Sequence, residues 1–155
     1  MKRMFVYKYY SRLSVSVVTH IHVSSLPITA EDAANNLTNY EDIPKRIDLM
    51  SPDSSLQLAL INMSEKETFI PHVHEEYELE KQLRNTQETW VIIRGQIEAS
   101  LFDLDTSLIT KVLLSEGDAL ITLKGGHNYK CLSPESLIYE FKSGPYNEVL
   151  DKKRF

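Results

Sequence analysis

The amino-acid sequence predicts an all-β protein made of antiparallel strands, and three observations lead to this fold class. Between residues 56 and 142, short segments are rich in β-branched or aromatic residues, which favour extended strands. Turn residues such as Gly, Asp and Ser separate most of these segments. Many short strands at regular spacing indicate an antiparallel sandwich or barrel rather than a parallel sheet with crossover helices. The predicted strands span residues 56–63, 68–74, 88–94, 96–103, 109–114, 119–123, 127–132 and 137–142.

The N-terminal part of the chain predicts one further strand and a short helix. From residue 13 to residue 24, apolar side chains alternate with mostly polar ones, which is the two-residue period of a half-buried strand. Thr29 is placed to cap a helix over residues 30–37, with Asp32 at the third helical position as in a capping box. Residues 47–49 form a segment that is too short to classify.

Residues 75–85 interrupt the strand pattern with a charged segment. Leu79 and Leu83 are four residues apart, and Glu80 and Arg84 have the spacing of an ion pair on a helix. We therefore expect a helical or irregular excursion between two strands. Since it begins one residue after His74, it is either a lid or pocket rim, or a plain surface insertion.

The composition bounds the size and class of the protein. With 155 residues and a mass of 17.9 kDa, the chain fits one domain with a substantial core. The net charge of -5 and the dispersed Lys and Arg residues argue against a nucleic-acid-binding face. The cationic run at residues 152–154 is interpreted as a solvated end of the chain.

The single cysteine, Cys131, excludes an intrachain disulfide, so a reducing compartment is the default expectation. Residues 1–10 have no long apolar run and do not resemble a signal peptide. No stretch has the length of a membrane span. The sequence therefore predicts a soluble protein of the cytoplasm that contacts neither membrane nor nucleic acid.

Three histidines and a carboxylate are candidates for a metal site. His72 and His74 alternate on a predicted strand, so both imidazoles point to the same face and can share one ion. Glu88 and His127 would arrive from other strands. Three neutral nitrogens and one carboxylate suit Fe, Mn, Ni, Co or Zn and leave coordination positions open for water or substrate.

His20 and His22 form a second pair with the same spacing on the N-terminal strand. No carboxylate or third histidine follows them at a comparable distance. Because they alternate with Val17, Ile21 and Val23, we expect their face to be exposed to solvent or to a partner subunit.

The chain resembles the cupin superfamily at two motifs. The first is a His-x-His pair followed by a glutamate and, after six residues, a glycine, which matches His72, His74, Glu88 and Gly95. Glu78 also stands near the histidine pair, but Asn85 occupies the position of its glycine. The resemblance therefore favours Glu88 as the ligand and makes the intervening segment an insertion.

The second motif begins at Gly117-Asp118 and ends at Gly125-Gly126-His127. Leu123 and Lys124 stand where many cupins have proline, which is a modest departure. The match makes His127 the remaining ligand. The residues at 141–146 and 151–155 also look like the tails of small single-domain metal-binding cupins.

The resemblance implies an antiparallel double-sheet jelly-roll barrel that closes around a metal, with dimerisation through N-terminal strands. In this interpretation residues 1–155 form one domain. Residues 1–55 are an N-terminal extension with a strand and a short helix, residues 56–142 are the barrel core, and residues 143–155 are a tail. Cupins carry many activities, so the fold alone does not define the function.

Strand alternation predicts the neighbours of the metal. Trp90 and Ile92 share the face of Glu88, and Tyr129 and Cys131 share the face of His127, so these side chains would line an apolar pocket. Trp90 is either core packing or a substrate platform, and Cys131 is interpreted mainly as a buried structural thiol. Tyr129 could bind or protonate an anionic intermediate.

Several polar residues close to the ligands in sequence complete the candidates. Glu78 and Glu80, together with Tyr129, are candidate acids or bases. Substrate contacts or hydrogen bonds to the ligands could come from residues that flank them, which are Arg84, Gln87, Lys124 and Asn128.

Three hypotheses on function follow. The first is a metal-dependent enzyme acting on a small polar molecule, carbohydrate-like or carboxylate-bearing, with Lewis-acid isomerase, epimerase or lyase chemistry or iron-dependent dioxygenase chemistry. The second is a non-catalytic cupin that binds one divalent transition metal and a small-molecule ligand. The third is a structural barrel without metal. The partners expected are a small molecule and a second copy of the chain.

Overall fold

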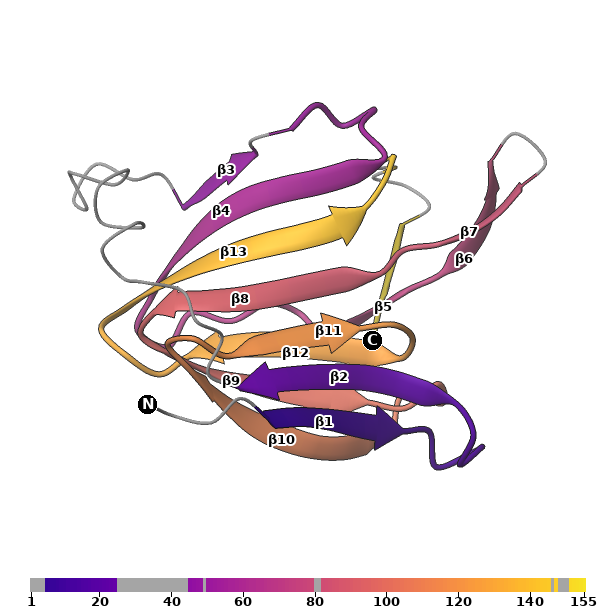
Figure 1. Cartoon of the computed structure of the whole chain (residues 1–155), viewed down its shortest axis with the longest axis horizontal. Coiled ribbons are helices and arrows are strands. Elements are labelled where there is room, and N and C mark those ends of the chain that lie inside the picture. The colour runs from indigo at the N-terminus through magenta and orange to yellow at the C-terminus, as the bar shows by residue number, and fades with distance from the viewer. Residues whose placement is uncertain (1–4, 25–44, 49, 80–81, 146, 148–150) are drawn as a thin grey trace.

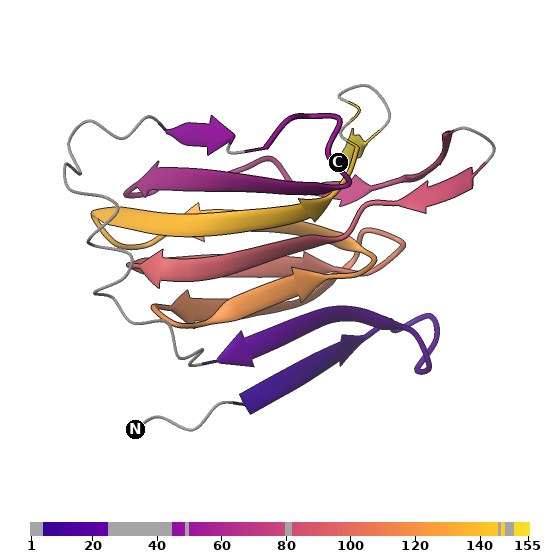
Figure 2. The ribbon, with the colours of Figure 1, turned by 45° about the horizontal axis from the view of Figure 1, so that its top comes forward.

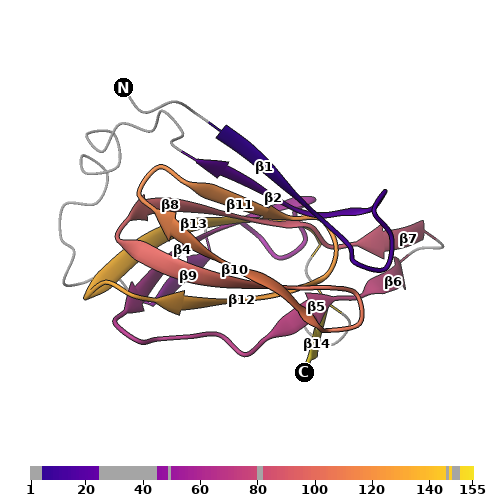
Figure 3. The ribbon, with the colours of Figure 1, turned by 90° about the horizontal axis from the view of Figure 1, so that it is seen from below.

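The computed structural model describes residues 5–24, 45–48, 50–79, 82–145, 147 and 151–155, and its regular structure consists entirely of β-strands (Figure 1). Two antiparallel sheets face each other, and a two-stranded ribbon projects from one end (Figures 1 and 3). Within the described ranges, no helix is long and apolar enough to cross a membrane. The structure is a jelly roll, as the sequence predicts.

The larger sheet has seven strands. In spatial order they are β1 (Phe5–Tyr10), β2 (Val18–Ser24), β11 (Ala119–Thr122), β8 (Glu88–Arg94), β13 (Glu135–Ser143), β4 (Leu56–Ser64) and β3 (Arg46–Asp48). The smaller sheet has five strands. In spatial order they are β10 (Leu108–Ser115), β9 (Gln96–Phe102), β12 (Gly126–Cys131), β5 (His72–His74) and β14 (Lys152–Arg154). The ribbon consists of β6 (Glu76–Leu79) and β7 (Gln82–Asn85).

The hydrophobic core lies between the two sheets and is built by alternate residues of their strands. Trp90 and Ile92 on β8 point toward Ala99 and Leu101 on β9, and all four are almost fully buried. Burying one large apolar side chain stabilises the fold by about 1.5–3 kcal/mol, so this cluster holds the sheets together. Its position fixes which residues at the ends of the same strands can meet.

The predicted strands between residues 56 and 142 are all present, and residues 88–94 match β8 at both ends. The prediction is too long for residues 68–74, since β5 begins at His72 and Thr68 only forms an isolated bridge with Lys130. Residues 103–107 connect β9 to β10 as the predicted hairpin loop. Residues 115–118 form the predicted turn before β11.

The helical prediction for residues 75–85 is wrong, because the segment forms the antiparallel ribbon of β6 and β7 (Figure 3). Glu76 pairs with Asn85 and Leu79 pairs with Gln82. Backbone hydrogen bonds across such a short hairpin replace those of a helical turn. Figure 1 shows the ribbon extending away from the two sheets next to β5.

The prediction for the N-terminal strand is partly wrong. The strand β2 starts at Val18, and residues 13–17 lie in a turn in which Leu13 and Val15 are exposed. A strand that was not predicted, β1, pairs with β2 and forms one end of the larger sheet (Figure 2). The predicted helix over residues 30–37 lies outside the described residues.

The tail is not simply a solvated end, because residues 152–154 form β14 and pair with β5. Lys152 lies opposite His74, and Arg154 lies opposite His72. Figures 1 and 3 both place the C-terminal strand beside β5. Backbone pairing therefore brings the last residues of the chain to the two histidines of the first motif.

Candidate metal centre

Four buried side chains meet between the two sheets at one end of the core. His72 and His74 come from β5 and His127 comes from β12, in the smaller sheet, whereas Glu88 is the first residue of β8 in the larger sheet. His127 lies directly opposite His72 in the pairing of β12 with β5. One donor atom from each of the four residues lies within 4.8 Å of the others.

A glycine turn aims His127 into this cluster. Gly125 has φ of +84°, a conformation that glycine adopts without steric cost. A Cβ atom at this position would lie 2.5 Å from the carbonyl oxygen of Phe102. The close approach of the turn to β9 therefore requires glycine, and it sets the point at which β12 begins.

Glu88 is the centre of the polar contacts in the cluster. Its Oε2 atom lies 3.2 Å from Nε2 of His74, and its Oε1 atom lies 3.1 Å from Nε2 of His127. The indole of Trp90 donates a hydrogen bond of 2.8 Å to Oε1. These contacts hold the carboxylate between two imidazoles and orient both of its oxygens.

Electrostatics keep the carboxylate ionised in this buried position. Burial raises the pKa of Glu88, but the imidazoles of His127 and His74 outweigh this effect and hold the pKa well below its usual value. Burial lowers the pKa of His127, against the opposing effect of Glu88. At neutral pH the cluster therefore contains a carboxylate and a neutral imidazole that can act as a ligand.

His72 presents a free lone pair to the same space. Its Nδ1 atom lies 3.0 Å from the backbone carbonyl oxygen of Ile70, so Nδ1 carries the proton and donates it. Among the described residues, its buried Nε2 atom has no hydrogen-bond partner. Burial, followed by the charges of His127 and Lys152, lowers the pKa of His72 to about 3. A neutral, buried and unsatisfied nitrogen is the arrangement that a metal ligand requires.

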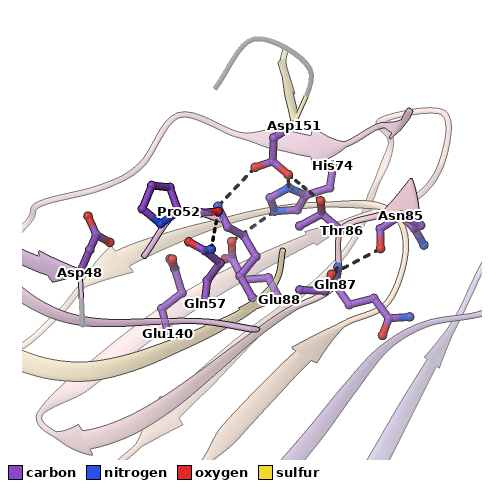
Figure 4. A network of polar contacts seen from close by, with 12 residues as sticks. Asp48, Pro52, Gln57, His74, Asn85, Thr86, Gln87, Glu88, Glu140 and Asp151 are labelled. Carbon is purple, nitrogen blue, oxygen red and sulfur yellow. Dashed lines mark hydrogen bonds and ion pairs between the residues drawn. The ribbon is translucent and has the colours of Figure 1, made fainter. Parts of the chain in front are cut away.

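The far side of His74 contacts Asp151, which precedes β14 (Figure 4). The Nδ1 atom of His74 lies 3.3 Å from Oδ1 of Asp151. The hydroxyl group of Thr86 donates a hydrogen bond of 2.6 Å to the same oxygen. The ammonium group of Lys142 lies 3.3 Å from Oδ2. Asp151 is thus held from three directions and in turn orients the ring of His74.

Asp151 also changes the protonation of His74. Burial lowers the pKa of this imidazole, but Asp151 and Glu88 together raise it to about 9. The pKa of Asp151 is itself lowered, since His74, Thr86 and Lys142 outweigh the effect of burial. His74 is therefore protonated at neutral pH in the metal-free protein and must release this proton before Nε2 can bind an ion.

The donor set fits a divalent transition metal. Three imidazole nitrogens and one carboxylate converge on a buried point, and one nitrogen has no other partner. Such a set suits Fe, Mn, Ni, Co or Zn, and a metal with more than four ligands would have positions for water or substrate. The sequence prediction named the same four residues, and the structure brings them together.

The predicted apolar neighbours lie in the core. Trp90 and Tyr129 are stacked with a ring-centroid distance of 3.7 Å, and both are almost fully buried. Ile92 and Cys131 belong to the same core cluster, and the sulfur atom of Cys131 lies 3.2 Å from the hydroxyl of Ser136. Burial, followed by the charges of Glu88 and Glu140, raises the pKa of Tyr129 well above its usual value, so its phenol stays protonated.

The other predicted site residues lie farther from the cluster or outside the described structure. Gln87 is exposed, and its backbone N–H donates to the hydroxyl of Ser143. Lys124 forms an exposed ion pair with Glu76, and the amide of Asn128 lies 3.4 Å from the carbonyl oxygen of Phe69. The side chains of Glu78 and Arg84, and the whole of Glu80, lie outside the described residues.

The prediction of an exposed face for the second histidine pair is wrong. His20 and His22 are both buried, because β2 pairs with β11 and places them opposite Thr122 and Leu120, whose side chains face the interior. Burial, followed by the charge of His127, lowers the pKa of His20 to about 3. His22 stacks on Tyr7 at a centroid distance of 5.2 Å.

Three residues around the cluster were not predicted. Thr86 and Asp151 have no local pattern that marks them, since they meet His74 only after the tail pairs with β5. Lys142 carries a usable signal, because it shares one face of β13 with the buried residues Ile138 and Glu140. A lysine on the inward face of a strand indicates a buried charge with a partner.

Comparison with solved structures places this architecture among known folds. KdgF from Halomonas sp. matches with a TM-score of 0.51 and 23% identity, over 67% of this chain and 80% of KdgF. The capsular polysaccharide assembling protein CapF from Staphylococcus aureus matches with a TM-score of 0.60 and 12% identity, over 76% of this chain. The matched region is 33% of CapF, so this chain corresponds to about a third of that protein.

No protein-family model and no curated protein sequence matches the chain. The structural matches nevertheless agree with the two motifs on the class of fold. The protein has the fold of the cupin superfamily, and its buried cluster of three histidines and one glutamate fits a metal site.

Proposed function

We propose that this protein is a metal-dependent enzyme that acts on a small polar molecule, carbohydrate-like or carboxylate-bearing. His72, His74, Glu88 and His127 would hold one divalent transition metal. The observation that carries the proposal is the convergence of their four donor atoms within 4.8 Å in a buried position. The structural likeness to a capsular polysaccharide assembling protein supports a carbohydrate-like molecule only as a general class.

The bound metal would supply Lewis-acid chemistry, or dioxygen chemistry if it is iron. The residues of the chain have separate tasks. Glu88 stays ionised between His74 and His127, Asp151 orients His74, and the indole of Trp90 fixes one carboxylate oxygen. The two sheets exclude water from the ligand side chains, all of which are buried. Tyr129, Glu78 and Glu80 remain the candidates for proton transfer.

A non-catalytic metal-binding cupin with a small-molecule ligand is the second candidate. Tyr129 favours it, because its ring is 1% exposed and stacked on Trp90, so its phenol has little access to a substrate. An acid or base must approach within hydrogen-bonding distance of the reacting group. Detection of a turnover would exclude the non-catalytic candidate, and substitution of Tyr129 by Phe then tests this residue, since an unchanged rate removes Tyr129 from the mechanism.

The first test is the metal content of protein purified without a metal-binding tag, measured by mass spectrometry. We expect close to one ion per chain in the wild-type protein and almost none in a His72→Ala, His74→Ala double variant. His22→Ala is the matched control, because it removes a buried imidazole outside the cluster. Absence of metal from the wild-type protein after reconstitution with each candidate ion would contradict the proposal.

The identity of the metal then directs the search for the reaction. Iron would favour oxidisable substrates and dioxygen chemistry. Zinc, nickel, cobalt or manganese would favour isomerase, epimerase or lyase chemistry. Each outcome restricts the substrates that need to be tested.

A further inference from the structure

A cavity of about 410 Å³ lies beside strand neighbours of the candidate metal ligands, although none of the four ligands themselves line it. It lies at the end of the jelly roll where the larger sheet and the tail strand meet, and Phe69, which packs edge-on against Trp90, forms part of its wall. The charged residues that line it are Arg46, Asp48, Lys142, Lys152 and Arg154. This volume has room for a small molecule of the size of a monosaccharide.

Strand register connects the cavity to the metal ligands on both sides. In the larger sheet, Lys142 on β13 lies opposite Glu88, and Gln57 on β4 lies opposite Lys142. In the smaller sheet, Lys152 lies opposite His74 and Arg154 lies opposite His72. Residues opposite each other in a sheet point to the same face, so these side chains lie on the ligand face of their sheets. Lys142 is buried there, Lys152 is half-buried and Arg154 is exposed.

The cations that line the cavity fall into two groups. Arg46 and Lys142 are already matched by carboxylates, since Arg46 contacts Asp48 and Glu140, and Lys142 contacts Asp151. Within the described part of the chain, no carboxylate forms an ion pair with Lys152 or Arg154. The tail strand therefore adds two positive charges without an ion-pair partner among the described residues to the wall of this cavity.

The opposite face of the same strand behaves differently. Lys153 points away from Lys152 and lies 3.6 Å from the carboxylate of Glu75. Alternation along β14 thus places Lys153 on one face, where it pairs with Glu75, and Lys152 and Arg154 on the other face, where both line the cavity although Arg154 is exposed. The arrangement is not that of a uniformly solvated basic tail.

We propose that Lys152 and Arg154 bind the anionic group of a small carboxylate ligand whose remainder extends toward the metal centre. The proposal rests on the proposed function, because it assigns the ligand to the cavity beside that metal. A guanidinium group and an ammonium group match a carboxylate in charge and hydrogen-bonding geometry. Phosphate sites commonly use helix N-termini, and the described residues contain no helix.

Calorimetric titration of the metal-loaded protein tests the proposal with three probes that share one sugar ring. These are glucuronate, which carries a carboxylate, glucose, which is neutral, and glucose 6-phosphate. We expect glucuronate to bind at least tenfold more tightly than glucose, with an affinity that falls as salt concentration rises. A Lys152→Gln, Arg154→Gln variant should lose this preference.

Two further variants separate charge from structure. Lys153→Gln removes a cation of the same strand that faces outward, and it should keep the preference for glucuronate. A Lys152→Arg, Arg154→Lys variant keeps both charges and should also retain most of it. Circular dichroism of each variant confirms that the fold is intact.

Equal binding of glucuronate and glucose, no binding of glucuronate, or an unchanged preference in the Lys152→Gln, Arg154→Gln variant would overturn the proposal. Tighter binding of glucose 6-phosphate than of glucuronate would overturn the choice of carboxylate. Metal content measured on the same samples keeps the two proposals apart. A metal-loaded protein without anion preference contradicts only this inference, whereas a metal-free protein that prefers glucuronate contradicts only the proposed function.

Discussion

The two His-x-His pairs of this protein have the same spacing and lie on strands, yet their surroundings differ completely. His72 and His74 meet Glu88 and His127, with four donor atoms within 4.8 Å. His20 and His22 are also buried, but the Nδ1 atom of His20 lies 3.0 Å from the hydroxyl of Thr19, and the Nε2 atom of His22 lies 3.9 Å from the carboxylate of Asp118. A metal site therefore requires the convergence of several strands, and the spacing of two histidines does not create it.

Removal of the carboxylate should have the largest effect on the first pair. In a Glu88→Gln variant the metal loses its only charged ligand, so we expect a loss of metal affinity of at least a hundredfold. In the wild-type protein, chelation should lower the free energy of unfolding by about 3 kcal/mol, which corresponds to an ion present at about a hundred times its Kd. Thermal unfolding of the wild-type protein and of Glu88→Gln, each with and without chelator, measures the stability that the metal adds in each protein.

The control for this prediction is a His20→Ala, His22→Ala variant, which removes both imidazoles of the second pair. It should unfold at a lower temperature than the wild-type protein but keep the full response to chelator. A chelator response that persists in Glu88→Gln, or disappears in the control, would show that the two pairs have been assigned the wrong roles.

One histidine of each pair also has an aspartate neighbour. The two aspartates allow a matched test of how a carboxylate beside a histidine affects metal affinity. Asp151 lies 3.3 Å from Nδ1 of His74, whereas Asp118 lies 3.9 Å from Nε2 of His22. Loss of a carboxylate that orients a metal-bound histidine typically reduces metal affinity by about tenfold to a hundredfold. We expect this reduction in Asp151→Asn and no change of affinity in Asp118→Asn, measured by competition with a chromogenic chelator.

Asp151→Glu serves as the rescue variant, because it restores the charge. Partial recovery of metal affinity would support orientation of His74 by the carboxylate. If Asp151→Asn binds the metal as tightly as the wild-type protein, Asp151 only anchors the tail to Thr86 and Lys142.

The turn at Gly125 connects the two pairs, since a Cβ atom there would contact both Phe102 and the ring of His20. In Gly125→Ala the left-handed backbone and the close carbonyl oxygen should cost about 2 kcal/mol of folding free energy. The displaced turn should also weaken metal binding through His127. Chemical denaturation checks the first effect, and a stability equal to that of the wild-type protein would mean that the turn adapts freely.

Acid titration compares the pairs once more, and its effect is small within the first pH unit below 6.5. His20 and His72 each have a folded pKa lowered to about 3, so below pH 6.5 the unfolded chain binds more protons than the folded protein. Stability of the metal-free protein should therefore decrease as pH falls through this window, by about 1 kcal/mol per pH unit for each such histidine.

The contribution of His74 to the change of stability with pH has the opposite sign. Because its pKa is raised to about 9, its contribution to stability is fully present below pH 6.5 and is lost as pH rises toward 9. Denaturation curves of metal-free wild-type protein and His20→Asn across this range check both statements. An unchanged acid slope in His20→Asn would mean that His20 is not held neutral in the folded protein.

Much of the fold was predictable because strand formation in residues 56–142 is local. Alternation of apolar and polar residues and the position of turn residues placed β8 at both ends and most other strands within one or two residues. The donor residues were also predictable, since the interval from Glu88 to Gly95 matches a known motif and the structure brings that glutamate to the histidines.

The errors share one cause, which is that the partner strand decides the outcome. The apolar side of residues 13–24 looked like the buried side, but pairing with β11 turned His20 and His22 inward. The charged segment at 75–85 has a spacing that also suits a helix, and cross-strand pairing made it a ribbon. Neither partner is encoded within the segment itself.

The amino-acid sequence by itself determined where most strands run and which four side chains could bind a metal, because side-chain periodicity and donor chemistry are properties of the residues. The tertiary structure alone decided which face of β2 is buried, which carboxylate orients His74, and which cations of the tail line the cavity. Those outcomes depend on register between strands that are distant in the chain, and a shift of one residue in that register would reverse every one of them.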